Sequence, residues 1–316
     1  MKNKIYFRAD ASAEIGYGHF IRTLALADML KSEFSCTFFT VEPTEYQLVE
    51  IANVCKCESM NGNNPLDDFL KFLQGDEIVV LDNYFYTSDY QKKIKDKGCK
   101  LVLIDDMHNM HYYADVIINN SLEDSILYDA EPYSKFCIGR GWLLLRSEFF
   151  KKTISNVKRN TDLIICFGGA DPYHITNKFL EYINPASYNG IIHVIAGDKV
   201  YIDNKYTSMI VVHRNISASQ IVELFDKSML AIVSSSTIHI EAMTRGIHLL
   251  VGYYVDNQKE DYDYGIKNNN FIGLGNLLEY DGHDIKVKMN AAKSINYRVK
   301  VSNIQQNFIN MFKSLD

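Results

Sequence analysis

Apolar residues near the start of the chain follow two different periods. The run Ile5-Tyr6-Phe7 is short and continuously apolar, which is typical of a buried strand. Apolar residues then recur at helical spacing, which predicts a helix with an inner face formed by Phe20, Leu24, Ala27 and Leu30. The polar, glycine-bearing segment 10–19 between them is therefore interpreted as the turn of a βα unit.

The alternation of strand-like and helix-like segments continues along the chain. In the first half, apolar runs predict strands at 37–41, 78–81, 101–104 and 116–118, and an apolar stripe predicts a helix at 66–73. In the second half, strands are expected at 163–167, 191–196, 209–212, 229–233 and 248–254, with a helix after the fourth. The stretch 285–312 is helix-like, although two valines weaken its pattern. This alternation favours parallel sheets covered by helices.

The pattern starts afresh in the second half, which indicates two α/β domains. A length of 316 residues fits two domains of about 150 residues each. The polar, basic segment 151–160 separates the halves. We therefore expect an N-terminal Rossmann-like domain at 1–155, a linker near Thr153 to Arg159, and a C-terminal Rossmann-like domain at 156–316 that ends in a helical extension.

Polar side chains follow three predicted strands of the first half at the point where each strand ends. These pairs are Asp82-Asn83, Asp105-Asp106 and Asn119-Asn120. Ligands of open parallel α/β sheets bind beyond the carboxyl ends of the strands, so the pairs predict a cleft there. Helix capping is the alternative interpretation, because Asp and Asn are also preferred N-cap residues.

The first turn carries candidate chemistry. Gly16 and Gly18 lack a Cβ, so the backbone there could approach a ligand closely. His19 is expected in the first helical turn, where the positive dipole end disfavours the imidazolium and favours a neutral ring that accepts a proton. The alternative is that the glycines only form a tight turn and that His19 packs or caps.

The second half repeats a glycine turn, Gly168-Gly169, and adds Ser235, Ser236 and Thr237 before a predicted helix. Hydroxyls together with helix N-terminal amides form a suitable cradle for a diphosphate, although Ser and Thr are also common N-caps. Further along, Glu241 could accept hydrogen bonds from ribose hydroxyls or take part in a capping box. Two amide side chains, Asn257 and Gln258, follow the strand at 248–254.

Composition and charge argue against three classes of function: nucleic-acid binding, membrane insertion and metal binding. A formal charge of −6 opposes general affinity for nucleic acid. No apolar stretch approaches the ~20 residues that span a bilayer, and residues 1–4 lead directly into a strand, so we expect a cytoplasmic protein without membrane insertion. The six cysteines are scattered, and the Cys55-x-Cys57 pair lacks a second pair or nearby histidines. We therefore expect reduced thiols and no metal site.

Several motifs occur in the order, and near the spacing, of one enzyme family. They are Arg8-Ala9-Asp10, Gly16 to His19, Leu81 to Tyr84, Ile104 to Asp106, Leu145 to Phe149, Gly168 to Asp171, Ser234 to Glu241 and Asn257-Gln258. The chain resembles the UDP-2,4-diacetamido-2,4,6-trideoxy-β-L-altropyranose hydrolases of pseudaminic (nonulosonic) acid biosynthesis. The resemblance covers about residues 4 to 275 and implies the glycosyltransferase-B fold, with two Rossmann-like domains and an interdomain cleft.

The resemblance implies a bacterial enzyme that uses water to release UDP from a UDP-sugar, with inversion at the anomeric carbon and without metal or cofactor. His19 would be the base, and Tyr84 would hold the sugar or the water. The expected substrate-binding residues are Asp10, Gly16, Gly18, Arg146, Gly168, Gly169, Ser235, Ser236, Thr237, Glu241, Asn257 and Gln258. The chain departs from the family pattern at Asn83, where members often have His, and at Ala170, where they often have Thr.

Two other functions fit the same pattern. An inverting glycosyltransferase of surface polysaccharide synthesis would use His19 to deprotonate a sugar hydroxyl in place of water. Such an enzyme would expose a basic, apolar patch if its acceptor were lipid-linked, and the sequence shows no clear cluster of this kind. A non-catalytic protein that binds nucleotide sugars is the third interpretation, because a fold does not secure an activity.

Overall fold

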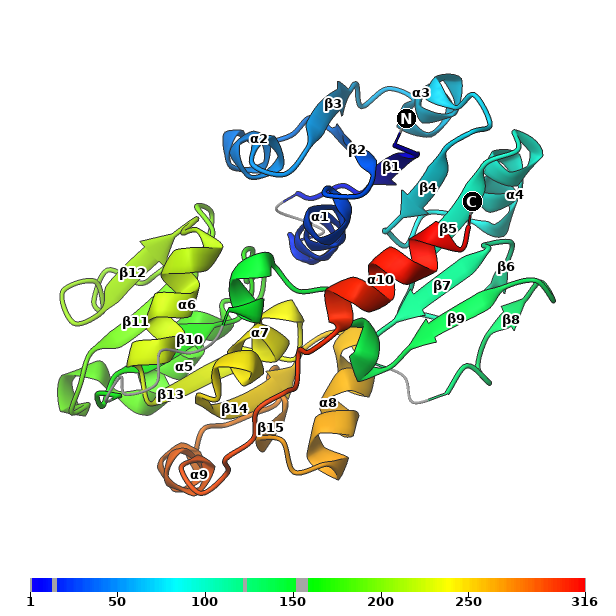
Figure 1. Ribbon diagram of the computed structural model, residues 1–316. Coiled ribbons are helices and arrows are strands. Elements are labelled where there is room, and N and C mark those ends of the chain that lie inside the picture. Colours follow the sequence, from blue (N-terminus) through cyan, green and yellow to red (C-terminus); the bar gives the residue numbers. More distant parts are fainter. Residues whose placement is uncertain (1, 13–15, 122–123, 152–158, 316) are drawn as a thin grey trace. The chain divides into compact units, whose positions relative to one another are not determined.

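A computed structural model describes residues 2–12, 16–121, 124–151 and 159–315 (Figure 1). Contacts divide the chain into two compact units. The first unit comprises Met1–Ala11, His19–Ser147 and Val301–Asp316, and the second comprises Ser12–Gly18 and Glu148–Lys300. Each unit contains one large parallel sheet with its own helices, so the predicted pair of Rossmann-like α/β domains is confirmed.

The first unit is built on a parallel sheet with the strand order β3-β2-β1-β4-β5-β7-β9. These strands are β1 (Lys4–Arg8), β2 (Ser35–Val41), β3 (Lys56–Met60), β4 (Ile78–Leu81), β5 (Lys100–Ile104), β7 (Val116–Asn119) and β9 (Lys135–Ile138). The central strands β4, β5 and β7 are buried almost throughout, as expected for parallel strands covered on both faces. A small pair, β6 (His111–Tyr112) and β8 (Asp129–Ala130), lies outside the main sheet.

Helices connect the first five of these strands along the described chain. They are α1 (Gly18–Leu30), α2 (Glu45–Ala52), α3 (Pro65–Phe72) and α4 (Ser88–Asp96). Two short 3₁₀ turns, η1 (Arg140–Trp142) and η2 (Ser147–Phe150), follow β9. The predicted inner face of α1 is confirmed, because Phe20, Leu24, Ala27 and Leu30 are all buried. Helix α2 begins with a capping box, in which Thr44 and Gln47 exchange hydrogen bonds.

The second unit repeats this design with the strand order β12-β11-β10-β13-β14-β15. Its strands are β10 (Leu163–Cys166), β11 (Ile192–Ala196), β12 (Val211–Arg214), β13 (Leu230–Ser234), β14 (His248–Tyr253) and β15 (Ile272–Asn276). Its helices are α5 (Ile175–Ile183), α6 (Ala218–Lys227), α7 (Thr237–Arg245), α8 (Lys259–Lys267) and α9 (Ile285–Ala292), with η3 (Pro185–Ser187) and η4 (Asp256–Gln258).

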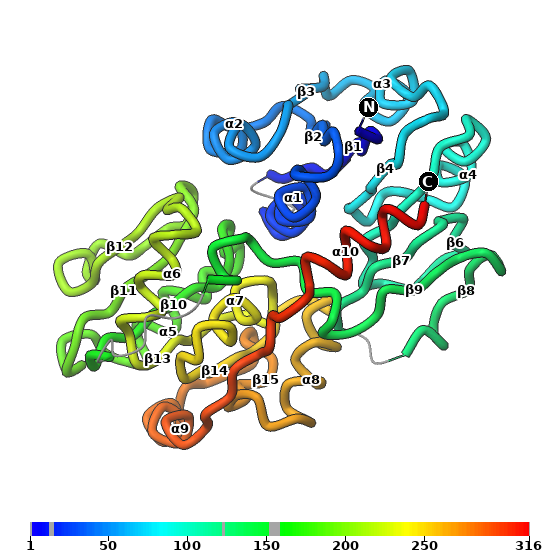
Figure 2. The backbone as a smooth tube through the Cα atoms, viewed as in Figure 1, coloured from blue at the N-terminus to red at the C-terminus, as the bar shows by residue number. Residues whose placement is uncertain are grey.

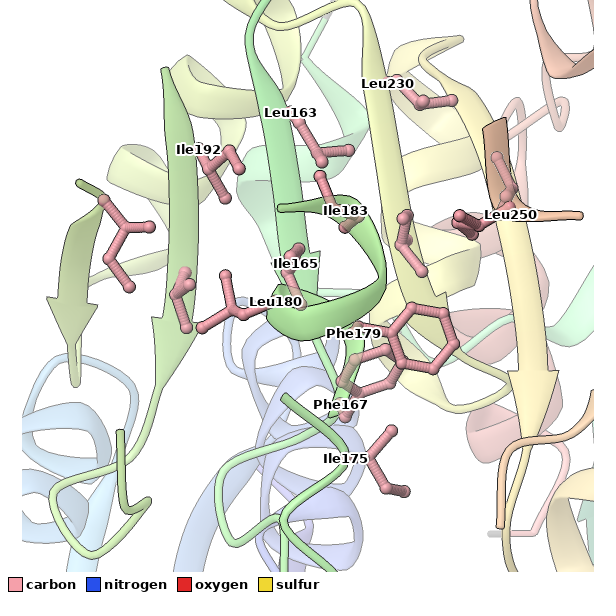
Figure 3. Packing of buried hydrophobic residues seen from close by; sticks show 14 of the residues in the cluster. Leu163, Ile165, Phe167, Ile175, Phe179, Leu180, Ile183, Ile192, Leu230 and Leu250 are labelled. Atoms are coloured by element: carbon pink, nitrogen blue, oxygen red, sulfur yellow. The ribbon is translucent and has the colours of Figure 1, made fainter. Parts of the chain in front are cut away.

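The core of the second unit lies between its sheet and helix α5. Phe179, Leu180 and Ile183 of α5 point toward Leu163 and Ile165 of β10, and all are buried (Figure 3). Burying a side chain of this size contributes about 1.5–3 kcal/mol, so this layer stabilises the packing of α5 on β10.

Each sheet has a switch point, where the strand order reverses direction. In the first unit β1 lies between β2 and β4, and in the second β10 lies between β11 and β13. Loops leaving the carboxyl ends of neighbouring strands diverge at a switch point and leave a crevice, which is where open α/β sheets bind ligands. The two glycine turns of the sequence follow β1 and β10.

The end of the chain differs from the predicted long helix at 285–312. Helix α9 ends at Ala292, and α10 (Ile304–Lys313) begins only after a non-helical segment that contains the two valines. The tube in Figure 2 shows this extended stretch before α10. Helix α10 groups with the first unit, where Gln305 donates to the Met29 carbonyl and Phe312 packs edge-on against Phe34.

The expected domain boundaries therefore differ from the division by contacts in three places. Residues Ser12–Gly18, expected in the first domain, group with the second unit. Residues Val301–Asp316, expected in the second domain, group with the first unit. The main segment of the first unit ends at Ser147, before the expected boundary at 155. The linker expected near Thr153 to Arg159 lies almost entirely outside the described residues.

Phe308→Ala tests how strongly α10 stabilises the first unit. Phe308 is fully buried, and its ring packs edge-on against Trp142 with centroids 5.2 Å apart. The substitution is expected to lower the free energy of unfolding by about 3–5 kcal/mol, measured by urea titration. Val287→Ala on the exposed face of α9 is the matched control, with an expected change within about 0.5 kcal/mol. Equal effects of the two substitutions would contradict the packing role of α10.

Candidate functional site

One buried carboxylate, Asp82, organises the switch point of the first unit. Asp82 directly follows β4 and is fully buried. It accepts hydrogen bonds from His19 Nδ1 (2.7 Å), from Arg22 Nε (2.7 Å) and Nη2 (2.6 Å), and from Thr23 Oγ1 (2.8 Å). The three donor residues are spaced i, i+3 and i+4, so they lie on one face of α1 and meet the strand end together.

Arg22 extends this network to the next strand. Its Nη1 donates to Asp106 Oδ2 at 2.7 Å, so one guanidinium joins the residues that follow β4 and β5. Burial alone would raise the pKa of Asp82, but Arg22 and His19 outweigh burial and hold that pKa below its ordinary value. Asp82 is therefore an ionised acceptor at neutral pH.

The tautomer of His19 follows from its partner. A carboxylate without a proton can only accept, so the 2.7 Å contact requires a proton on Nδ1 of His19. In the neutral ring Nε2 then carries the lone pair. The arrangement matches the His-Asp pair of acyl-transfer enzymes, in which the carboxylate orients the ring and stabilises the imidazolium.

Tyr84 completes this group of side chains. Its ring packs edge-on against His19 with centroids 4.5 Å apart, and Tyr84 is about half exposed. Burial of the phenol and the nearby Asp106 carboxylate raise the pKa of Tyr84, so its hydroxyl stays protonated and can donate a hydrogen bond. The first unit thus brings together the two residues predicted to be catalytic.

The first glycine turn contains one glycine with a left-handed backbone. Gly16 has a φ of +77°, and its N–H donates to the Ser12 carbonyl at 2.9 Å, while Gly18 is the first residue of α1. Among the described residues beyond each glycine's own chain neighbours and helix backbone, no atom lies within 4 Å of a Cβ built on either glycine. Residues 13–15 of this turn lie outside the described residues.

Asp10, expected to bind substrate, makes structural contacts. Its Oδ1 accepts from the Val41 amide at 2.8 Å and from the fully buried Arg8 Nη1 at 2.5 Å. Its own amide donates to Asn83 Oδ1 at 2.8 Å. Asp10 therefore ties the ends of β1, β2 and β4 together, which fixes the frame around His19.

In the second unit, the glycine turn after β10 is shaped by close packing. Gly168 has a φ of +95°, and a Cβ on Gly197 would lie 2.1 Å from the Gly169 carbonyl oxygen. The amides at the start of the following helix α5 are already occupied, because Asp171 accepts from the amides of Ile175 (2.8 Å) and Thr176 (2.9 Å). The N-terminus of α5 is therefore capped by the protein itself.

The N-terminus of α7, on the other side of the switch point, is arranged differently. Ser236 is the N-cap residue of α7, and its side chain makes no capping hydrogen bond, so the capping box considered for Glu241 does not form. The Ser235 hydroxyl is buried and has no hydrogen-bond partner among the residues that the structure describes. His239 holds the turn in place, because its Nδ1 donates to the Ser236 carbonyl at 2.6 Å and its Nε2 lies 3.1 Å from Asp261 Oδ2.

The remaining predicted residues lie at separate places in the fold. Glu241 is buried in α7. Gln258 is buried in η4, where its Oε1 accepts from the Tyr254 amide at 3.1 Å, and Asn257 precedes it. Arg146 is partly buried just before η2.

Capping explains part of the polar strand ends. Asp105 accepts from the amides of Met107 and His108, and Asn119 accepts from the amide of Ser121, so both stabilise local turns. Asp82 does not cap and binds side chains of α1. Sequence reasoning missed Arg22 and Thr23, although their spacing from His19 on a helix facing acidic strand ends was a detectable signal.

Asp82→Asn tests the buried network through stability. The variant is expected to lose about 3–5 kcal/mol of unfolding free energy at pH 7, because Arg22 and His19 lose an ionised buried partner. Since the folded pKa of Asp82 is depressed, its contribution is present above about pH 4 and disappears as pH falls through the folded pKa. Urea titrations at pH 7 and pH 3 measure the difference.

The control for that experiment is Asp68→Asn, which breaks an exposed ion pair with Lys71 and should change stability by less than about 1 kcal/mol. A loss for Asp82→Asn that is the same at both pH values would contradict the ionised network.

Comparison with known proteins shows which sequences this chain is similar to. No family model matches the chain. The chain is 27% identical over 268 residues to the UDP-2,4-diacetamido-2,4,6-trideoxy-β-L-altropyranose hydrolase of Campylobacter jejuni, covering 81% of this chain and 93% of that protein. It is 28% identical over 298 residues to an uncharacterized protein of Methanocaldococcus jannaschii, covering 87% of this chain and spanning 61% of the length of that protein.

Solved structures agree on the fold. A UDP-glucosyltransferase from Polygonum tinctorium superposes with a TM-score of 0.62 at 10% identity, covering 100% of this chain and 99% of that one. Within the described residues, no helix is long and apolar enough to cross a membrane, and no group of three His, Cys, Asp or Glu side chains is placed to hold a metal ion. The similarity in sequence and fold confirms the resemblance indicated by the motifs: the chain is a relative of the UDP-2,4-diacetamido-2,4,6-trideoxy-β-L-altropyranose hydrolase and has the glycosyltransferase-B fold.

Proposed function

We propose that this protein is a UDP-sugar-processing enzyme that hydrolyses a UDP-diacetamido-trideoxy sugar without a metal ion, in nonulosonic acid biosynthesis. The observation that carries the proposal is the His19-Asp82 pair at the switch point of the first unit, with Nδ1 committed to the carboxylate at 2.7 Å. Similarity to the Campylobacter hydrolase along 81% of the chain supports the substrate class.

In the proposed reaction, a water oxygen attacks the anomeric carbon while the bond from that carbon to the phosphate oxygen breaks. The bonding electron pair leaves with UDP, and the configuration inverts. His19 Nε2 accepts the proton of the water, and the Asp82 carboxylate stabilises the imidazolium that forms. Tyr84, whose ring contacts His19, donates a hydrogen bond to the water or to the sugar.

The departing diphosphate gains negative charge, which needs nearby donors. The N-terminus of α7 is the candidate in the second unit, because the Ser236 side chain does not cap it and the Ser235 hydroxyl lacks a partner among the described residues. The α5 terminus is a weaker candidate, since Asp171 occupies its amides and would repel a phosphate. We assign the diphosphate to Ser235, Ser236 and Thr237, with the Gly168-Gly169 turn as the opposite wall of the same crevice.

His19→Phe tests the base. Turnover of UDP-2,4-diacetamido-2,4,6-trideoxy-β-L-altropyranose should fall by about 10²–10⁴-fold, while the dissociation constant for UDP stays unchanged. Proton NMR of the reaction without any acceptor measures UDP release and the anomeric configuration of the first-formed sugar together. The control is His283→Phe, at an exposed histidine, which should keep full activity.

Retention of most of the turnover in His19→Phe would refute His19 as the base. Release of UDP by the wild type only after addition of a sugar acceptor would establish a glycosyltransferase and refute hydrolysis. Binding of UDP without turnover of any UDP-sugar would establish a non-catalytic protein.

The double variant Ser236→Ala/Thr237→Val tests the diphosphate site. Hydrogen bonds to a charged group contribute about 1.5–3 kcal/mol each, so loss of both hydroxyls should lower UDP affinity, measured by calorimetry, by about 10²–10⁴-fold. Ser217→Ala is the matched control, because Ser217 also precedes a helix but its hydroxyl caps α6. Equal affinity in the double variant and the wild type would remove the α7 terminus from the proposal.

A further inference from the structure

A second concave site lies beside the His19 group in the first unit. We call it the β4-β5 pocket, because its walls come from residues that follow β4, from the end of β5 and from the segment between β5 and β6. Its lining includes Asn83, Tyr84, Tyr86, Asp105, Met107 and Met110. Tyr84 joins the pocket to the site already described, since its ring contacts that of His19.

The pocket contains one carboxylate oxygen that can accept a hydrogen bond from a ligand, Oδ1 of Asp105. Asp105 is only 7% exposed. Its Oδ2 accepts from two backbone amides and from the hydroxyls of Tyr112 and Tyr128, each at 3.0 Å. Among the described residues none donates a hydrogen bond to Oδ1. This carboxylate oxygen can therefore accept a hydrogen bond from a ligand N–H or O–H.

Asn83 supplies a hydrogen-bond donor to the same pocket. Its Oδ1 is fixed by the Asp10 amide at 2.8 Å, which sets the orientation of the side-chain amide. Its Nδ2 makes only a long contact of 3.5 Å to the Asp10 carbonyl, and an amide nitrogen carries two hydrogens. Asn83 can therefore donate to a ligand carbonyl.

The rest of the lining is apolar and adaptable. Met107 and Met110 are partly buried, and Tyr86 is almost fully buried. Thioether side chains fit closely around small apolar groups. An acceptor, a donor and an apolar wall together match a secondary amide that ends in a methyl group: the N–H donates, the carbonyl accepts and the methyl packs against sulfur.

We propose that the β4-β5 pocket binds an N-acyl group of the sugar, with its N–H on Asp105 Oδ1, its carbonyl on Asn83 Nδ2 and its methyl against Met107 and Met110. This inference rests on the proposed function, because it assigns the pocket to the sugar of a nucleotide-sugar substrate. A carboxylate substituent would be repelled by Asp105. A free amino group would pair with Asp105 but would leave the methionine wall without a partner.

Met107→Ala tests the apolar wall by widening it. Two UDP-sugar substrates are compared, one with N-acetyl groups and one with N-butanoyl groups. Each added CH₂ is worth about 0.8 kcal/mol when buried, so the variant should raise the kcat/KM ratio of the butanoyl to the acetyl substrate by about tenfold. Met209→Ala, at an exposed methionine of the second unit, is the control and should leave the ratio unchanged. An unchanged ratio in Met107→Ala would overturn the inference.

A second measurement does not depend on hydrolysis. The full chain is labelled with ¹³C-methyl methionine, and Met107→Leu and Met110→Leu assign the two pocket signals. Free 2,4-diacetamido-2,4,6-trideoxy-L-altrose should shift both signals, and the corresponding diamino sugar without acetyl groups should shift them less.

The two measurements separate the two proposals. UDP release by the wild type together with unmoved Met107 and Met110 signals would overturn the pocket and leave the hydrolase intact. Absence of UDP release together with shifted signals would refute the hydrolase and support an N-acyl site. A larger shift with the diamino sugar would overturn the assignment to an N-acyl group.

Discussion

The first unit depends on one ionised carboxylate placed where a buried strand ends. Asp82 is removed from water, and removal of a charge from water is stabilising only when its lone pairs are satisfied. Helix α1 supplies the required donors from consecutive turns. These hydrogen bonds offset the cost of desolvating Asp82. The same hydrogen bonds set the angle of α1 on the sheet and the orientation of His19. Stability and site geometry are therefore inseparable at this point.

The two units use the same topology for different chemistry. At the switch point of the first, a helix presents side chains to a strand end, and the product is an oriented imidazole. At the switch point of the second, a helix presents backbone and hydroxyl groups, and His239 and Asp261 hold its first turn. The second unit is also asymmetric, because Asp171 occupies amides at the start of α5 whereas the Ser236 side chain does not cap α7.

Local patterns were enough for most of the fold and for part of the site. The stripe of α1 and the buried runs of β4, β5 and β10 were visible because their neighbours are local in sequence or uniformly apolar. Strand β3 was missed because most of its residues are polar, so it lacks the apolar run of a buried strand. Strand β15 was missed because two of its residues are glycines. The spacing of Arg22 from His19 was a detectable signal, but its particular partners could not be read from the chain, since Asp82 and Asp106 lie 60 and 84 positions away.

Helix α10 has a consequence for how the protein is made. The first unit is discontinuous in sequence, and its buried Phe308 and Phe312 lie in a segment that is translated after the second unit. During synthesis the apolar surface around Phe34 and Trp142 therefore stays uncovered until the second unit has been translated. Final packing of the N-terminal sheet is thereby tied to the synthesis of α10, so the need for chaperone protection lasts through translation of the second unit.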